Sequence, residues 1–100
     1  MQKLNETHLS EALTTLPQWK LEDGQLVRDW TFKDFVAAMA FVNNVATMAE
    51  AAGHHPDIEI HYNRVRLTLV THDADGITAK DVAMAENFNQ NSGLLPDRPT

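Results

Sequence analysis

The chain has 100 residues, with 14 Asp or Glu against 8 Lys or Arg and a formal net charge of −6; we expect one domain (residues 1–100) with a core over about 5–91. This acidic balance argues against direct binding to nucleic-acid phosphates, because that affinity comes largely from neutralising backbone charge. The absence of cysteine excludes disulfides, thiolate catalysis and cysteine zinc sites.

The N-terminal residues 1–6 contain no apolar core of signal-peptide length. No segment approaches the roughly 20 apolar residues that a bilayer-spanning helix needs. We therefore expect a cytoplasmic protein without membrane association, with organelle import left open.

The first third of the chain predicts a short helix followed by a hairpin. Asn5 or Thr7 can cap a helix through residue 13, and Pro17 ends it. Residues 19–21 are typical of a strand, and residues 22–24 contain the Asp-Gly turn signal. Residues 26–32 then alternate, and one face carries Leu26, Trp30 and Phe32.

Residues 33–52 have helical periodicity, with capping-box-like spacing of Thr31 and Asp34. Two adjacent apolar stripes run along this helix: Phe35, Met39, Val42, Ala46 and Ala49, and Phe41, Val45, Met48 and Ala52. A helix packed on one sheet needs a single stripe, so the second indicates another buried contact, such as a subunit interface. The alternative is a helix deeply buried in a monomer.

A second hairpin follows the long helix. Gly53 stands at a helix C-cap position, and Pro56 biases the preceding residue toward an extended backbone. Residues 58–62 and 65–72 alternate on either side of a turn at Asn63-Arg64. This pairing would place Tyr62 beside Val65 and Asp57 near Val70.

The last predicted element is a helix from a capping pair, Thr78 and Asp81, to about residue 90. A turn at Asp75-Gly76 precedes it, and the tail after Gly93 is expected to be loose. The order helix, hairpin, long helix, hairpin, helix predicts an α+β fold in which helices cover one face of an antiparallel sheet.

Three histidines and two carboxylates form the strongest candidate site. In the predicted fold, His54 and His55 follow the long helix, one turn after Glu50. His72 ends the fourth strand at the same end of the sheet, and Asp81 opens the last helix. Histidine exchanges protons near neutral pH, so this group favours general acid–base catalysis.

A metal site would use the same residues, but the pattern argues against it. Adjacent side chains of an extended chain point to opposite faces, so His54 and His55 are poorly placed to share an ion. The helical His spacing of zinc enzymes is absent. Residues 73–76 have a faint likeness to a calcium loop, but the terminal Glu ligand is missing. His8 and His61 are expected on the surface.

The spacing of these residues resembles that of pterin-4a-carbinolamine dehydratases. The resemblance rests on Glu50, His54-His55-Pro56, Tyr62, His72 and Asp81 at fixed intervals. It extends upstream to Trp19 and residues 32–35, and it covers about residues 5–91. It implies a four-stranded antiparallel sheet with three helices packed on one face, and a homodimer or homotetramer with the long helix at a subunit contact.

The resemblance also implies an activity, the dehydration of 4a-hydroxytetrahydropterin to quinonoid dihydropterin and water. This reaction recycles the tetrahydropterin (for example tetrahydrobiopterin) used by aromatic amino acid hydroxylases, and it needs no metal or organic cofactor. The family's active-site histidines correspond to His54, His55 and His72. By this analogy His54 and His72 transfer protons, and His55 chiefly binds the pterin.

Four further residues have supporting or structural readings. Glu50 and Asp81 can hydrogen-bond imidazoles and set their tautomers, although helix capping alone also explains Asp81. Trp19 is a candidate wall of the pterin pocket or a core residue. Tyr62 is expected to pack rather than to react.

Two alternatives to a dehydratase remain from the sequence. Related domains act as non-catalytic binding or assembly modules, such as a dimerisation cofactor for a transcription factor, and would use the long helix. The intact histidine set favours catalysis. A metal-dependent hydrolase is the second alternative.

Overall fold

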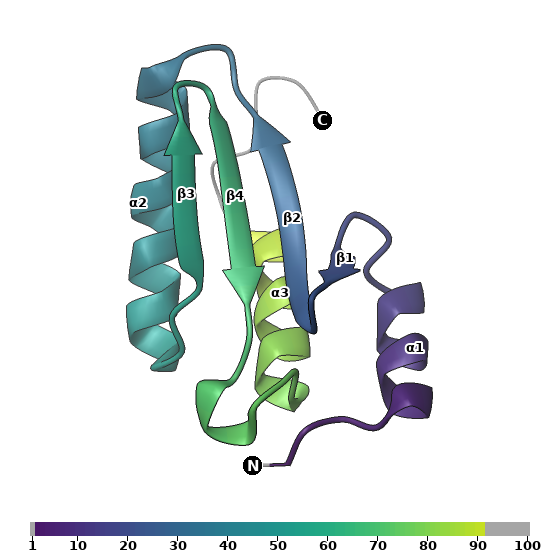
Figure 1. Cartoon of the computed structure of the whole chain (residues 1–100). Coiled ribbons are helices and arrows are strands. Elements are labelled where there is room, and N and C mark those ends of the chain that lie inside the picture. Colours follow the sequence, from purple (N-terminus) through teal and green to yellow (C-terminus); the bar gives the residue numbers. More distant parts are fainter. Residues whose placement is uncertain (1, 92–100) are drawn as a thin grey trace.

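The computed structural model describes residues 2–91, and the tail predicted to be loose lies outside them. Within this range helices alternate with pairs of strands along the chain (Figure 1). The elements are α1 (Glu6–Thr14), β1 (Lys20–Glu22), β2 (Gln25–Thr31), α2 (Phe35–Ala52), β3 (Asp57–His61), β4 (Arg64–Leu69), the 3₁₀ turn η1 (His72–Ala74) and α3 (Ala79–Asn91).

The four strands form one antiparallel sheet in the order β1-β2-β4-β3. Figure 1 shows α2 and α3 behind this sheet and α1 beside β1. Leu9 and Leu13 of α1 are partly buried against the core. The predicted α+β fold, with three helices and a four-stranded antiparallel sheet, is confirmed.

Side-chain caps explain where the first two helices begin. The Asn5 carboxamide oxygen accepts a hydrogen bond from the His8 backbone N–H at 2.8 Å, and Asp34 accepts one from Ala37 at 2.9 Å. Asp34 is thus the N-cap of α2, which begins at Phe35. The sequence predicted instead a capping box of Thr31 and Asp34 and a helix that begins at residue 33. Both caps satisfy N–H groups that have no partner within the helix.

The β3–β4 turn differs from its prediction by two residues in register. His61 pairs with Arg64 and Asp57 with Thr68, so the turn is Tyr62-Asn63 rather than Asn63-Arg64. Tyr62 has a φ of 55° and is 64% exposed, so the expectation that it packs was wrong. A shift of two residues preserves the alternation of faces, so the predicted inward residues still face the helices.

The hydrophobic core lies between the sheet and the helices. Trp30 of β2 contacts Trp19 edge to face at a centroid distance of 5.8 Å and Phe41 of α2 at 4.8 Å. Full burial of a side chain of this kind contributes about 1.5–3 kcal/mol. The largest fully buried apolar side chains are Phe41, Phe88, Leu16, Leu26, Leu67, Leu69, Val45 and Val65.

One polar network crosses this apolar region. The Asn89 side-chain oxygen accepts hydrogen bonds from Trp19 Nε1 at 3.0 Å and from Arg28 Nη1 at 2.6 Å. The Arg28 guanidinium also lies 4.2 Å from the centre of the Trp30 ring. Burial lowers the pKa of Arg28. These contacts tie the end of α3 to the β1–β2 hairpin.

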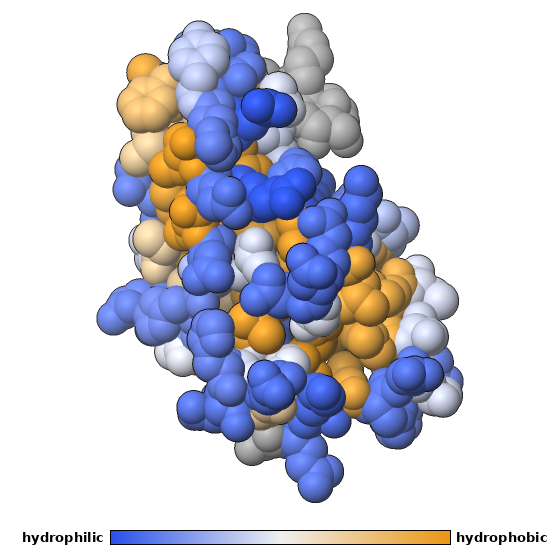
Figure 2. All heavy atoms as spheres, in the orientation of Figure 1, coloured by the Kyte–Doolittle hydropathy of each residue, from blue (hydrophilic) through white to orange (hydrophobic). Residues whose placement is uncertain are grey.

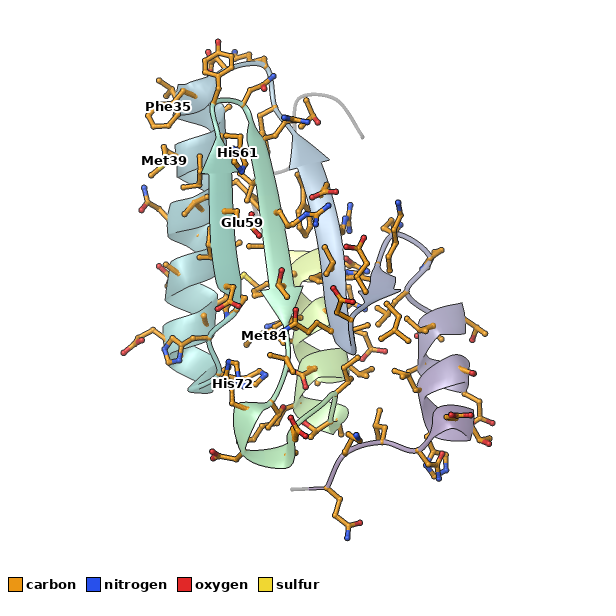
Figure 3. All side chains as sticks on the ribbon, in the orientation of Figure 1. Phe35, Met39, Glu59, His61, His72 and Met84 are labelled. Atoms are coloured by element: carbon orange, nitrogen blue, oxygen red, sulfur yellow. The ribbon has the colours of Figure 1, made fainter. Side chains whose placement is uncertain are left out.

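The buried face of α2 draws residues from both predicted apolar stripes. The buried face comprises Ala38, Phe41, Val42, Val45 and Ala49. By contrast, Phe35 is 49% and Val36 is 75% exposed, and Figure 3 shows Phe35 and Met39 projecting at the outer side of α2. Part of the predicted surplus apolar surface is therefore open to solvent in a single chain.

By length and apolar composition, α2 also meets the criteria for a membrane-spanning helix, with a mean hydropathy of 1.3 over 18 residues. From the sequence we expected no such segment. Core helices of soluble proteins meet the same criteria, because alanine and valine suit both environments. Here one face of α2 packs in the core.

The helix-free face of the sheet is polar (Figure 2). Arg66 donates two hydrogen bonds to the Asp29 carboxylate, at 2.8 and 3.0 Å. These bonds hold the pKa of Asp29 below its usual value. Such exposed pairs contribute little stability. The polar side chains of this face are solvated, as on an antiparallel sheet that packs helices on its other face only.

Candidate functional site

The end of α2 directs two neighbouring histidines to different partners. Gly53 has a φ of 66° and closes the helix. His54 Nε2 lies 2.6 Å from Asp81 Oδ1, and the His54 side chain is 14% exposed. His55 Nε2 lies 2.8 Å from Glu50 Oε2, and the His55 side chain is 62% exposed. The expectation that the neighbours point in different directions is confirmed.

Asp81 is the buried centre of the site, at 0% exposure. Its Oδ2 accepts hydrogen bonds from the Thr78 backbone N–H at 2.8 Å and from the Thr71 hydroxyl at 2.7 Å. Its Oδ1 contacts His54. Both readings of Asp81 therefore hold, because the same carboxylate caps α3 and binds an imidazole.

This contact sets the tautomer of His54. An ionised carboxylate can only accept hydrogen bonds, so Nε2 of His54 carries a proton. In the neutral ring Nδ1 is then the free base, and in the protonated ring Nδ1 is a donor. A positioned imidazole with one nitrogen committed to a carboxylate suits general acid–base chemistry.

His72 lines the same cleft as His54 and His55. It is exposed and begins η1, and Figure 3 shows it at the end of β4 near the end of α2. The cleft has a volume of about 330 Å³. Its lining residues are Gly53, His54, His55, Val70, Thr71, His72, Asp73 and Lys80. The three histidines are thus brought together as predicted.

Glu50 is a surface partner rather than a buried one. Its side chain is 81% exposed where it meets His55, so solvent screens the pair and its energetic value is small. Glu50 can still restrict the orientation of the His55 ring. The two carboxylates of the predicted site therefore differ in how firmly they hold an imidazole: buried Asp81 holds His54 more firmly than exposed Glu50 holds His55.

Trp19 occupies the core and not the cleft. It is 4% exposed, its ring meets Trp30, and its indole N–H is bound by Asn89. The pocket-wall reading of Trp19 is therefore replaced by its core alternative.

Lys80 is a cleft residue that the sequence did not predict. It lines the histidine cleft and also an adjoining hollow of about 460 Å³ between the end of α2 and α3. His54 is the other residue common to both. In the sequence, the one sign that Lys80 belongs to the site is its position next to Asp81, in the first turn of α3. Among residues 2–91, no three His, Asp or Glu side chains are grouped to hold a metal ion.

Comparison with known proteins identifies relatives over most of the chain. A relative from Acidobacterium capsulatum is 58% identical over 88 residues, covering 88% of this chain and 96% of its own. One from Chloroflexus aurantiacus is 52% identical over 93 residues, covering 93% of this chain and all of its own. Both carry the provisional name pterin-4-alpha-carbinolamine dehydratase.

Two solved structures share the fold. A "transcriptional coactivator/pterin dehydratase" from Brucella melitensis is 39% identical, with a TM-score of 0.83 over 88% of this chain and 96% of that one. A pterin dehydratase-like RuBisCO assembly factor of the alpha-carboxysome has a TM-score of 0.61 over 77% of this chain and 89% of its own, at 20% identity, which shows the fold alone. The family pattern described as "Pterin 4 alpha carbinolamine dehydratase" matches residues 2–91. With its histidine cleft, its fold and these relatives together, the chain belongs to the pterin-4a-carbinolamine dehydratase family.

Proposed function

We propose that this protein dehydrates 4a-hydroxytetrahydropterin to quinonoid dihydropterin and water, and thereby recycles a tetrahydropterin cofactor. The observation that supports this most is the convergence of His54, His55 and His72 on one cleft, with His54 held by a buried carboxylate. Family membership supports the class of substrate.

The reaction needs two proton transfers. Hydroxide is a poor leaving group from C4a, so an acid must protonate it as the C4a–O bond breaks. The N5 proton must also leave, so that the N5–C4a double bond can form. Each step is general acid–base catalysis, worth about 10²- to 10⁴-fold in rate. Two imidazoles that line one cleft can serve the two positions.

We assign the proton transfers to His54 and His72 and pterin binding chiefly to His55. His54 is oriented by Asp81. The His72 side chain is exposed and lines the cleft, so it is open to the substrate. His55 is more exposed and has only a surface partner, Glu50, which suits a role at the rim.

The proposal is tested by timing the loss of 4a-hydroxytetrahydropterin with wild-type protein and with His72→Ala. We expect wild-type catalysis and a fall in kcat of about 10²-fold or more for the variant, because one proton transfer is lost. His61→Ala is the matched control, since His61 is exposed on the helix-free face and should keep full activity. An inactive wild type, or a fully active His72→Ala, would contradict the proposal.

The exposed part of α2 favours a second role, in self-association or assembly. We propose that a face including Phe35, Val36 and Met39 is a subunit contact in a homodimer or homotetramer. Contiguous apolar surface of this kind is typical of interaction sites. An assembly role would use this face and not the cleft, so a partner that binds here should still bind a variant lacking all three histidines.

Val36→Asp tests this contact by analytical ultracentrifugation. An acidic residue in the first turn of α2 suits the helix dipole, so loss of the oligomer would report on the interface and not on the helix. We expect wild-type oligomer and a shift of Val36→Asp toward monomer. Thr7→Asp adds the same charge to the first turn of α1 and should leave the oligomer intact. A monomeric wild type would refute the proposed contact.

A further inference from the structure

His72 is the first residue of a small closed loop. The backbone N–H of Thr71 donates to the carbonyl of Gly76 at 2.9 Å, and Gly76 returns a bond to Thr71 at 3.3 Å. Inside this pair, the N–H of Asp75 donates to the His72 carbonyl at 3.0 Å. The pair Thr71–Gly76, called the loop neck below, therefore sets where the His72 backbone lies.

One side of the loop neck is attached to the other proton-transfer histidine. The Thr71 hydroxyl donates to Asp81 Oδ2 at 2.7 Å, while Asp81 Oδ1 contacts His54 Nε2 at 2.6 Å. A movement of the loop neck would thus change the placement of His72 relative to His54.

The other side of the loop neck is held by the N-terminal segment. The Leu4 N–H donates to the carbonyl of Ile77, next to Gly76, at 2.8 Å, and Leu4 packs partly buried against the core. The methylene stem of Lys3 covers Gly76 so closely that an added Cβ would overlap its Cδ and lie 2.9 Å from its Cγ. Figure 1 shows the start of the chain passing the lower end of the β4–α3 connection.

We propose that Lys3 and Leu4 are positioning residues that clamp the His72 loop against Asp81. Neither residue lines the histidine cleft, so any effect on catalysis must pass through the loop neck. The inference rests on the proposed dehydratase function for its kinetic consequence, but the clamp itself is a structural relation. A displacement of a catalytic group by about 1 Å can cost up to 10²-fold in rate.

Gly76→Ala is the direct test. Gly76 is not among the residues with positive φ, so the new methyl group meets only the Lys3 stem. We expect kcat for 4a-hydroxytetrahydropterin to fall about tenfold, with KM changed less than twofold. The ring signals of His72 in NMR spectra should shift, whereas those of His8 and His61 should not.

Lys3→Ala/Gly76→Ala supplies the compensating change. In this double variant the methyl group added at Gly76 fills part of the space that the Lys3 stem occupies, and the Leu4–Ile77 hydrogen bond remains. The clamp is therefore kept, and kcat and the His72 signals should return toward wild type. Leu13→Ala is the stability control. It weakens the packing of α1 on the core, and should lower the Tm without changing kcat or the His72 signals. Deletion of residues 2–4 removes the clamp outright and should reproduce the Gly76→Ala phenotype if Gly76→Ala fails to fold.

Three outcomes would overturn the clamp. They are unchanged His72 signals in Gly76→Ala, a double variant as impaired as Gly76→Ala, and a deletion of residues 2–4 with normal kcat and His72 signals. An inactive wild type whose His72 signals still follow the expected pattern would refute the dehydratase proposal and leave the clamp standing.

Discussion

His54→Ala is expected to reduce turnover of 4a-hydroxytetrahydropterin by about 10²- to 10⁴-fold, the usual contribution of one general acid–base group. The substitution also removes the partner of a fully buried carboxylate oxygen on Asp81. Leaving such an atom unpaired costs about 1–3 kcal/mol of stability. Kinetics should therefore be measured well below the Tm of the variant.

His54→Gln separates the two effects. A glutamine amide can donate a hydrogen bond to Asp81 but cannot exchange a proton near neutral pH. We expect His54→Gln to recover part of the lost stability in thermal unfolding and none of the lost turnover. Recovery of turnover in His54→Gln would show that His54 orients the site and transfers no proton.

Asp81 substitutions are expected to have the second-largest effects, on stability and activity together. Asp81→Ala deletes the cap on Thr78, the bond from Thr71 and the contact with His54. The lost cap costs about 0.5–2 kcal/mol, and each stranded buried donor adds about 1–3 kcal/mol. With two such donors, on Thr71 and His54, besides the cap, we expect a total loss of about 2.5 kcal/mol or more, measured by urea unfolding.

Asp81→Asn isolates the tautomer of His54. The asparagine oxygen can still accept from Thr78 and Thr71, so most of the stability should remain. Its NH₂ group would face His54 Nε2 and favour the tautomer that carries the proton on Nδ1. We expect turnover to fall about 10²-fold or more. Asp57→Asn, which removes an exposed carboxylate from β3, should leave turnover unchanged, and a normal Asp81→Asn would refute the orienting role.

The sequence predicted what periodicity and short-range chemistry control. Val65 and Leu67 alternate with polar neighbours and are buried in β4, because an antiparallel strand shows one face to the core. The capping pair Thr78 and Asp81 was found from spacing alone, and its observed bond is 2.8 Å. The convergence of the histidines followed from placing each at the same end of the sheet.

The features that could not be predicted from the sequence depend on the backbone conformation of one residue and on contacts between distant segments. The turn was misplaced because Tyr62 adopts a positive φ, which side chains other than glycine, asparagine and aspartate seldom do. The dual use of Asp81 requires Thr71 and His54 to approach it from two other segments. Lys3 reads as an ordinary N-terminal lysine, and only the structure shows its stem over Gly76.

Both tryptophans of this chain are buried in the core, at 4% and 2% exposure for Trp19 and Trp30, and neither lines the histidine cleft. Their intrinsic fluorescence should therefore shift to longer wavelength when the core opens to water and should be insensitive to single substitutions in the cleft. An emission spectrum taken from the same sample as each rate would then separate a site variant that has lost its chemistry from one that has lost its fold.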